Sequence, residues 1–216
     1  TGVLSGTPLN AHVGVHAVLI TASSDKTAQS VTQSFNITVA NTNDTPEITS
    51  IGAQTATEDV AFSKIIQVTD VDNTTVTISA TLADGSSLPS WLSLTNVQNK
   101  QATLSGTPLN GDVGAIGIMV TATDVEFTST ETFTLTVANT NDAPTFTSTG
   151  ITTATEDAGY SYTAVATDVD AGANVTLVGT TIPTWLTFDE NTGVLSGTPL
   201  NAHVGVHAVL ITASSD

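Results

Sequence analysis

The chain has 216 residues, of which 39% are apolar, so a packed core is feasible and the composition is not that of a disordered acidic tail. Its 20 acidic residues against three basic ones give a formal net charge of −17, which excludes attraction to nucleic acid or to anionic membranes. There is no cysteine, which excludes disulfide bonds and cysteine-based metal or redox sites. No stretch approaches the roughly 20 apolar residues of a membrane span, so we expect no membrane insertion in this segment.

Internal repeats organise the sequence. The hexapeptide Ser-Gly-Thr-Pro-Leu-Asn begins at Ser5 and returns at Ser105 and Ser196, and the first 25 residues recur without change as 192–216. Because the chain begins inside a repeated motif, we expect it to be a window on a longer protein. The repeats predict three modules: residues 1–43 are the C-terminal part of a first, 44–141 form a complete second, and 142–216 are most of a third that lacks its last strand.

Strand and turn signals fill the complete module. Segments rich in Val, Ile and Thr predict strands over 60–69, 74–82, 113–124 and 128–137. Between them, Asp84-Gly85 and Ser105-Gly106-Thr107-Pro108 supply turn chemistry. No segment has a sustained apolar period of 3.6 residues, which argues against helices. The pattern therefore predicts an all-β fold of tandem Greek-key β-sandwiches with short linkers.

One tryptophan per module follows a proline, as Trp91 and Trp185. Exposed tryptophans can stack on sugar rings. A single tryptophan beside leucines more often fills the core of a sandwich, and we favour this interpretation.

Two nearly identical linkers separate the predicted modules. Residues 41–46 read Asn-Thr-Asn-Asp-Thr-Pro and residues 139–144 read Asn-Thr-Asn-Asp-Ala-Pro, each after an alternating apolar run. Proline cannot donate to a sheet ladder, so each linker ends a strand. Calcium prefers six to eight oxygen ligands from carboxylates, amides, backbone and water. The linkers therefore predict calcium sites where two modules meet.

The order of motifs in 44–141 resembles the cadherin repeat, and more closely the bacterial dystroglycan-type cadherin-like (CADG) module. The residues that carry this resemblance are Trp91-Leu92, Leu-Ser-Gly-Thr-Pro at 104–108 and Asp-Val-Gly at 112–114. The resemblance covers the whole chain. It implies cadherin- or immunoglobulin-like sandwiches in a large bacterial surface adhesin, located outside the cell or on its surface.

In cadherin repeats, acids and amides of two successive modules converge on shared calcium ions, and the resemblance carries these roles to this chain. The second junction would gather six acids, which would repel one another without a cation. Because His12 and His203 stand where the middle module has Asp112, we expect the first junction to bind calcium more weakly. The alternative is that these acids are ordinary solvated turn residues. The candidate calcium ligands are Glu58, Asp70, Asp72, Asp112, Asp124, Asn41, Asn43, Asp44, Asn139, Asn141, Asp142, Asp168, Asp170 and Asp216.

Two histidine pairs are spaced four residues apart, His12 with His16 and His203 with His207. On a strand, each pair would share one face and could bind zinc or nickel, although no cysteine or positioned second acid supports such a site. Catalysis finds less support, because the sequence has no nucleophile elbow and no phosphate loop. We expect no enzyme and identify no catalytic residue.

The sequence as a whole predicts a structural role, as calcium-rigidified extender repeats of an extracellular adhesin or surface fibre. The alternative is a binding module whose loops or tryptophans hold a surface glycan or a protein ligand. The expected partners are neighbouring repeats of the same chain or head-to-tail copies. Residues 142–191 of one chain and 1–43 of the next would rebuild a whole module, unless the window is simply cropped from a longer array.

Overall fold

The computed structural model describes residues 2–26, 28–73 and 75–215. It divides into two compact units. The first contains residues 1–56, 60–108 and 114–137, and the second contains 57–59, 109–113 and 138–216. Apart from strands, the described residues form short 3-10 helices, none of them long and apolar enough to cross a membrane. These are η1 (Asn10–His12), η2 (Asn110–Asp112) and η3 (Asn201–His203).

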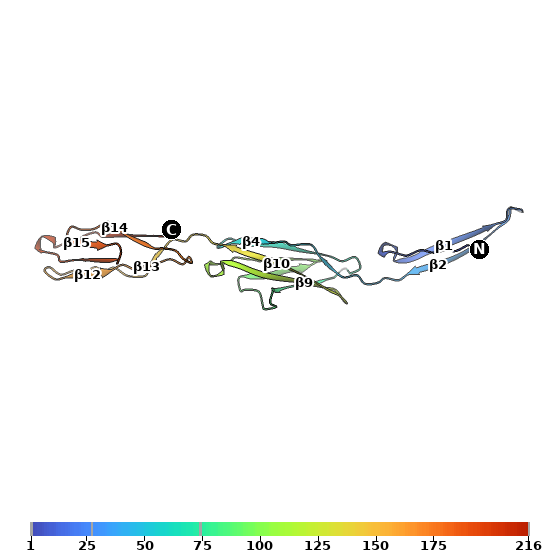
Figure 1. The fold of residues 1–216 in the computed structure, drawn as a ribbon, viewed down its shortest axis with the longest axis horizontal. Coiled ribbons are helices and arrows are strands. Elements are labelled where there is room, and N and C mark those ends of the chain that lie inside the picture. The colour runs from blue at the N-terminus through green and yellow to red at the C-terminus, as the bar shows by residue number, and fades with distance from the viewer. Residues whose placement is uncertain (1, 27, 74, 216) are drawn as a thin grey trace. The chain divides into compact units, whose positions relative to one another are not determined.

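The first unit contains an antiparallel hairpin of β1 (Gly14–Ser23) and β2 (Ser30–Val39), which form a two-stranded sheet of their own (Figure 1). Their register runs from Gly14 opposite Val39 to Ser23 opposite Ser30. Most apolar side chains of this hairpin are exposed, with Leu19 at 66% and Val31 at 71%, whereas Val18 and Val39 are half-buried. A two-stranded hairpin is marginally stable in water, so β1 and β2 lack the burial that normally stabilises such strands.

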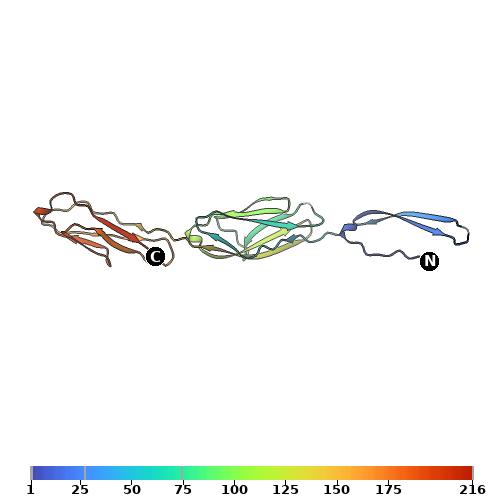
Figure 2. The same ribbon diagram turned by 90° about the horizontal axis from the view of Figure 1, so that it is seen from above.

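The same unit contains a sandwich of two four-stranded sheets, with strand orders β3-β5-β8-β7 and β4-β10-β9-β6 (Figures 1 and 2). The chain crosses between the two sheets after β3, β4, β5, β6 and β8, and only β7–β8 and β9–β10 are neighbours within one sheet, which is consistent with the predicted Greek-key sandwich. The all-β prediction is therefore confirmed. The strands are β3 (Glu47–Ile48), β4 (Gln54–Thr57), β5 (Phe62–Thr69), β6 (Thr77–Leu82), β7 (Leu92–Gln98), β8 (Gln101–Gly106), β9 (Gly114–Thr123) and β10 (Thr128–Ala138).

Alternate residues of the central strands form the core of this sandwich. Ile66 of β5, Leu104 of β8 and Ile118 of β9 are each 0% exposed. Phe133 and Leu135 of β10, the neighbour of β9 in the same sheet, are 5% and 0% exposed. Period-two alternation places these side chains on one face, as the sequence predicts. The tryptophan of this module, Trp91, is half-buried and packs against this core, as expected for a core residue.

The predicted turn at 105–108 is wrong for its first half, because Ser105 and Gly106 end strand β8. Gly106 serves a packing purpose there. A Cβ at this position would lie 1.8 Å from the backbone oxygen of Trp91, so only glycine permits strand β8 to approach the backbone at Trp91 so closely. Gly197 holds the same relation to Trp185, at 2.0 Å.

The second unit contains a less complete set of strands, paired as β11-β13, β12-β16-β15 and β14-β17. In the first unit β9 lies between β6 and β10, whereas β17 of the second unit pairs with β14 alone among the described strands. The strands are β11 (Thr145–Phe146), β12 (Tyr160–Thr163), β13 (Ala166–Thr167), β14 (Thr176–Thr181), β15 (Leu186–Asp189), β16 (Val194–Gly197) and β17 (Leu210–Ser214).

Candidate metal centre

Three carboxylates meet in the second unit. Oxygen atoms of Glu58, Asp142 and Asp170 all lie within 4.8 Å of one another, and within the described residues this is the one group of three potential metal ligands so close together. Glu58 is 1% exposed and is the one charged side chain that is fully buried there. Like charges at this separation repel strongly when they are shielded from water. The arrangement therefore calls for a compensating positive charge.

The local structure at Glu58 explains its burial. Glu58 follows β4, and its backbone N–H donates to the carbonyl of Ala138 at the end of β10, 3.0 Å away. One carboxylate oxygen accepts from the backbone N–H of Thr140 in the linker, at 3.2 Å. The next residue, Asp59, has φ 58°, a left-handed conformation that aspartate tolerates, and this turns the chain away from the site. The last strand and its linker thus cover Glu58.

Asp168 and Asp170 form the Asp-x-Asp pair of this site. Asp170 accepts from the backbone N–H of Asp142 at 2.7 Å and from the side-chain amide of Asn110 at 2.9 Å. Asp168 accepts the backbone N–H of Asp170 at 2.8 Å, which lowers the pKa of Asp168, with a further contribution from the Ser215 hydroxyl. Its other oxygen, Oδ2, is buried without a hydrogen-bond partner. A buried carboxylate oxygen in this state is an available cation ligand.

The first unit repeats this arrangement around the other linker. Asp72 accepts from the backbone N–H of Asp44 at 2.6 Å and from the amide of Asn10 at 3.2 Å. The Asp44 hydrogen bond is the main cause of the lowered pKa of Asp72. Asp70 accepts the backbone N–H of Asp72 at 2.9 Å, and its Oδ2 is again buried without a partner. The linker aspartate and the Asp-x-Asp pair therefore make the same hydrogen bonds at both sites.

Additional groups complete the first site. The amide of Asn43 donates to Asp124 at 2.9 Å, and the pKa of Asp124 is lowered mainly by the backbone N–H of Phe127. Asn73 donates to the side-chain oxygen of Asn43 at 2.6 Å. Lys100 donates from Nζ to the backbone oxygen of Asp70 at 2.5 Å, which places a positive charge beside this site. Sequence reasoning missed Asn73 and Lys100, because neither belongs to a recurring motif.

Asp112 makes a hydrogen bond within its own turn. Its carboxylate accepts the backbone N–H of Leu109 at 2.9 Å and so caps η2, and it is not among the three clustered carboxylates. His12 and His203 make the same contact through Nδ1, accepting from Leu9 at 2.8 Å and from Leu200 at 3.0 Å. Aspartate and histidine are thus interchangeable as caps of this 3-10 turn.

The predicted sharing of a strand face by the paired histidines is wrong. His12 and His203 lie in 3-10 helices, where Nδ1 already accepts a hydrogen bond. Nε2 of His16 lies 2.6 Å from the carbonyl oxygen of His12, and Nε2 of His207 lies 2.8 Å from that of His203. In this arrangement the rings bind their own turn, and a shared zinc or nickel ion would have to displace these contacts.

The other predicted ligands within the described residues are linker asparagines. The side chain of Asn41 hydrogen-bonds Asp72, whereas the amide of Asn141 donates to the backbone of Asp142 at 3.3 Å. Asn139 is exposed. Asp216 lies outside the described residues. Each linker therefore contributes its aspartate most directly to the site.

The fold and the two matching linker sites define a modular protein of tandem immunoglobulin-like β-sandwich repeats. The chain belongs to the family described as "Putative Ig domain", whose model matches residues 45–138 and 143–216. That family is immunoglobulin-like, and the finer resemblance to the dystroglycan-type cadherin-like module stays a prediction.

Known proteins similar to the chain include an adhesin. The "Serine-rich adhesin for platelets" of Staphylococcus aureus (strain USA300) is 33% identical over 188 residues, a match that covers 87% of this chain and 8% of the adhesin. Among solved structures, the SrpA adhesin from Streptococcus sanguinis has a TM-score of 0.40 at 19% identity, covering 50% of this chain and 67% of that one. The endo-fucoidan hydrolase MfFcnA4 has a TM-score of 0.42 at 22% identity, covering 97% and 34%. At such TM-scores neither structure bears on function.

Proposed function

We propose that the chain is a spacer segment of a cell-surface adhesin, built from immunoglobulin-like repeats whose linkers are held by calcium. The observation that carries this proposal is the approach of Glu58, Asp142 and Asp170 to within 4.8 Å. Asp142 belongs to the linker, and the other two acids belong to the repeats before and after it. A cation shared by the three would tie the linker to both repeats.

The ligand chemistry favours calcium. The groups available at this site are carboxylate and amide oxygens, together with the unpartnered Oδ2 of Asp168. Hard oxygen ligands from flexible side chains suit calcium better than zinc or copper, which prefer nitrogen or sulfur. Extracellular modules typically bind calcium with dissociation constants of about 10⁻⁴–10⁻³ M, and we place this site in that range.

The two sites should differ in strength. At the first site, Lys100 already brings a positive charge to the backbone of Asp70. This charge lowers the attraction for a second cation there. We therefore assign the tighter calcium site to Glu58, Asp142 and Asp170.

Calcium would give the linker a mechanical role. Without the ion, the Asn-Thr-Asn-Asp segment is a short polar linker that carries repelling charges. With the ion, the same charges become ligands that fix its conformation, so that a distal domain is held away from the cell. The similarity to adhesin segments supports a location on the cell surface, and the repetition of the same acids supports a structural role and not an enzymatic one.

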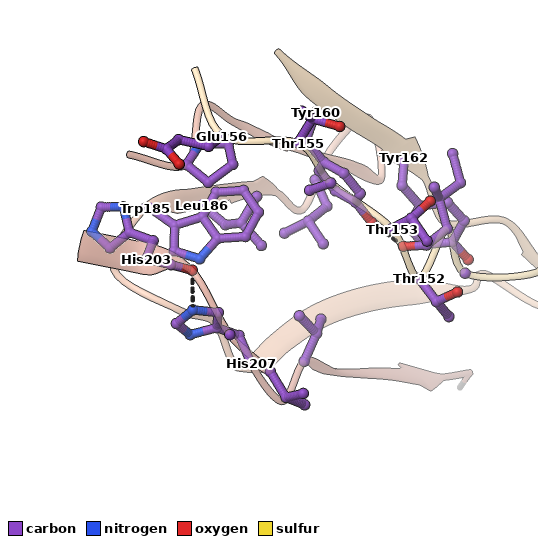
Figure 3. Close-up of a pocket in the computed structure, with 18 of the residues that line it drawn as sticks. Thr152, Thr153, Thr155, Glu156, Tyr160, Tyr162, Trp185, Leu186, His203 and His207 are labelled. Atoms are coloured by element: carbon purple, nitrogen blue, oxygen red, sulfur yellow. Dashed lines mark hydrogen bonds between the residues drawn. The ribbon is translucent and has the colours of Figure 1, made fainter. Parts of the chain in front are cut away.

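A glycan-binding role is less well supported. Trp91 packs half-buried against the core of its sandwich, which leaves little of its indole face for a sugar ring. Trp185 lines an open cavity of the second unit, where its ring already contacts those of Tyr160 and His203 (Figure 3).

A calcium titration tests the proposal directly. The 216-residue chain would be stripped with EDTA and titrated with Ca²⁺, while heat release, thermal melting and small-angle scattering are recorded. We expect saturable binding at submillimolar to millimolar calcium, a higher melting temperature and a stiffer particle. Binding that leaves melting and scattering unchanged would reject a role for calcium in stiffening, and absence of binding would reject the metal site.

A further inference from the structure

One of the chain's three lysines reaches the first linker site. Lys26 lies in the turn between β1 and β2, and Lys64 lies in β5. Lys100 lies in the turn between β7 and β8, and its Nζ donates to the backbone oxygen of Asp70 at 2.5 Å. Both residues of this contact are half-buried. A charge-assisted hydrogen bond therefore holds the ammonium group at the Asp-x-Asp pair of the first site.

The backbone at Lys100 has a conformation that residues with a side chain seldom adopt. Its φ is 61°, and Asn99 before it has φ 49°. The left-handed region costs free energy for a residue that carries a Cβ, so it persists where surrounding contacts hold it. Here the N–H of Val68 donates to the carbonyl of Lys100 at 2.9 Å, while Nζ donates to Asp70. The turn thus positions the lysine from both its backbone and its side chain.

The second unit has a glycine at the equivalent place. Gly193 precedes β16 with φ 70°, and its carbonyl accepts from the N–H of Ala164 at 2.8 Å, as the carbonyl of Lys100 accepts from β5. A Cβ on Gly193 would lie 2.4 Å from the backbone oxygen of Ala164, so a lysine cannot occupy this place unless the backbone shifts. Asp168, the counterpart of Asp70, therefore receives no lysine from this turn.

The two linker sites share their acids and differ in their counter-charge. In each, the N–H of the linker aspartate donates to the second acid of the Asp-x-Asp pair. The first site has the ammonium group of Lys100 beside it, whereas the second brings Glu58, Asp142 and Asp170 within 4.8 Å of one another. Neighbouring carboxylates repel, and an attached ammonium group offsets this repulsion as a bound cation would.

We propose that Lys100 is a built-in counter-ion that takes the place of a metal ion at the first linker. The linker at 41–46 then keeps its conformation without calcium, whereas the linker at 139–144 needs the ion; this contrast alone rests on the proposed calcium function. Because the ammonium group is covalently attached, its local concentration does not fall when free calcium falls. One chain would thus contain a permanently ordered linker and a linker ordered by calcium.

Amide hydrogen exchange of the whole chain, followed by NMR, tests the proposal. The reporters are the backbone N–H groups of Asp44 and Asp142, which make matching hydrogen bonds inside nearly identical linkers. In EDTA, the N–H of Asp44 should exchange at least about tenfold more slowly than that of Asp142. K100M keeps an aliphatic side chain but removes the charge, and it should abolish this difference.

Two control variants separate the charge from the side chain that carries it. K26M removes the same charge from an exposed turn, and K100R keeps the charge at the first site. Both should leave the N–H of Asp44 protected as in the parent chain. Unchanged exchange at the buried Ile118 of β9 identifies variants with an intact sandwich.

Two results in EDTA would overturn the proposal. One is equal exchange of Asp44 and Asp142 in the parent chain, which decides the matter even where K100M fails to fold. The other is unaltered protection of Asp44 in K100M with an intact sandwich.

Calcium separates this inference from the proposed function. At ten times its dissociation constant, Ca²⁺ should slow exchange at Asp142 about tenfold in the parent chain and affect Asp44 much less, whereas in K100M it should slow both. If Ca²⁺ slows Asp44 as strongly in the parent as in K100M, Lys100 does not replace a metal ion. If Ca²⁺ changes neither amide while Lys100 still protects Asp44, the calcium function is overturned and the built-in counter-ion is retained.

Discussion

The backbone N–H of Asp142 donates a 2.7 Å hydrogen bond to Oδ2 of Asp170. The same contact joins Asp44 to Asp72 at 2.6 Å. In each case the linker uses its backbone to hold the second acid of an Asp-x-Asp pair, which leaves carboxylate oxygens free nearby. Hydrogen bonding thus gathers negative charges that repulsion alone would separate, and we expect cations to stabilise both sites.

Replacement of Glu58 by glutamine should have opposite effects with and without calcium. In EDTA, E58Q removes one of three neighbouring charges, so the melting temperature should rise. With saturating Ca²⁺ it removes a ligand, so the dissociation constant should increase on the order of tenfold. Calorimetry and thermal melting in both buffers measure the two effects.

E156Q is the matched control for that prediction. Glu156 occupies the same motif but is exposed, and within the described residues it belongs to no group of three close metal ligands. E156Q should therefore bind calcium and melt as the parent chain does. If E58Q also behaves like the parent in both buffers, the cluster does not bind calcium.

The cap of η2 can be tested by two substitutions at Asp112. D112A leaves the backbone N–H of Leu109 without its acceptor and should lower the free energy of unfolding by about 0.5–2 kcal/mol. D112H should cost much less, because His12 and His203 accept the equivalent N–H. Urea unfolding compares the variants, and an equal loss in both would show that the cap does not explain the interchange.

Gly106 should be intolerant of any side chain. In G106A the new Cβ would lie 1.8 Å from the backbone oxygen of Trp91, so the free energy of unfolding of the sandwich should fall by about 1–3 kcal/mol. G111A is the control, since a Cβ there meets nothing within 4 Å and the outer repeats carry Ala11 and Ala202 at this place. Similar melting temperatures for the two variants would contradict the packing argument.

Acid should destabilise the metal-free chain. The pKa values of Asp72, Asp124 and Asp168 are lowered in the folded state, mainly by backbone N–H donors. A lowered pKa gives stability above the ordinary aspartate value of about 3.9, and this stability is lost as the pH falls through the folded value. In EDTA, the melting temperature should therefore fall below about pH 4, and it should fall less in D168N. A melting temperature that holds steady down to pH 2 would contradict this.

Local patterns were sufficient to predict the class of fold. Alternation in 113–124 and 128–137 predicts β9 and β10 because the two faces of a strand differ in burial, and this difference is visible in the sequence. Strand β8 was not recognised, since Gly106 ends it and glycine usually indicates a turn. The role of Gly106 depends on its close contact with Trp91, and no local sequence pattern records that contact.

The sequence by itself determined that the chain consists of all-β repeats with oxygen-rich linkers, because periodicity, proline positions and repetition are properties of neighbouring residues. The tertiary structure decided which of the candidate acids lie close together. Glu58 joins Asp142 and Asp170 because β10 and its linker cover it, while Asp112 turns to cap η2. Proximity and burial depend on which strands pair and which edges stay open, and long-range packing sets both of these.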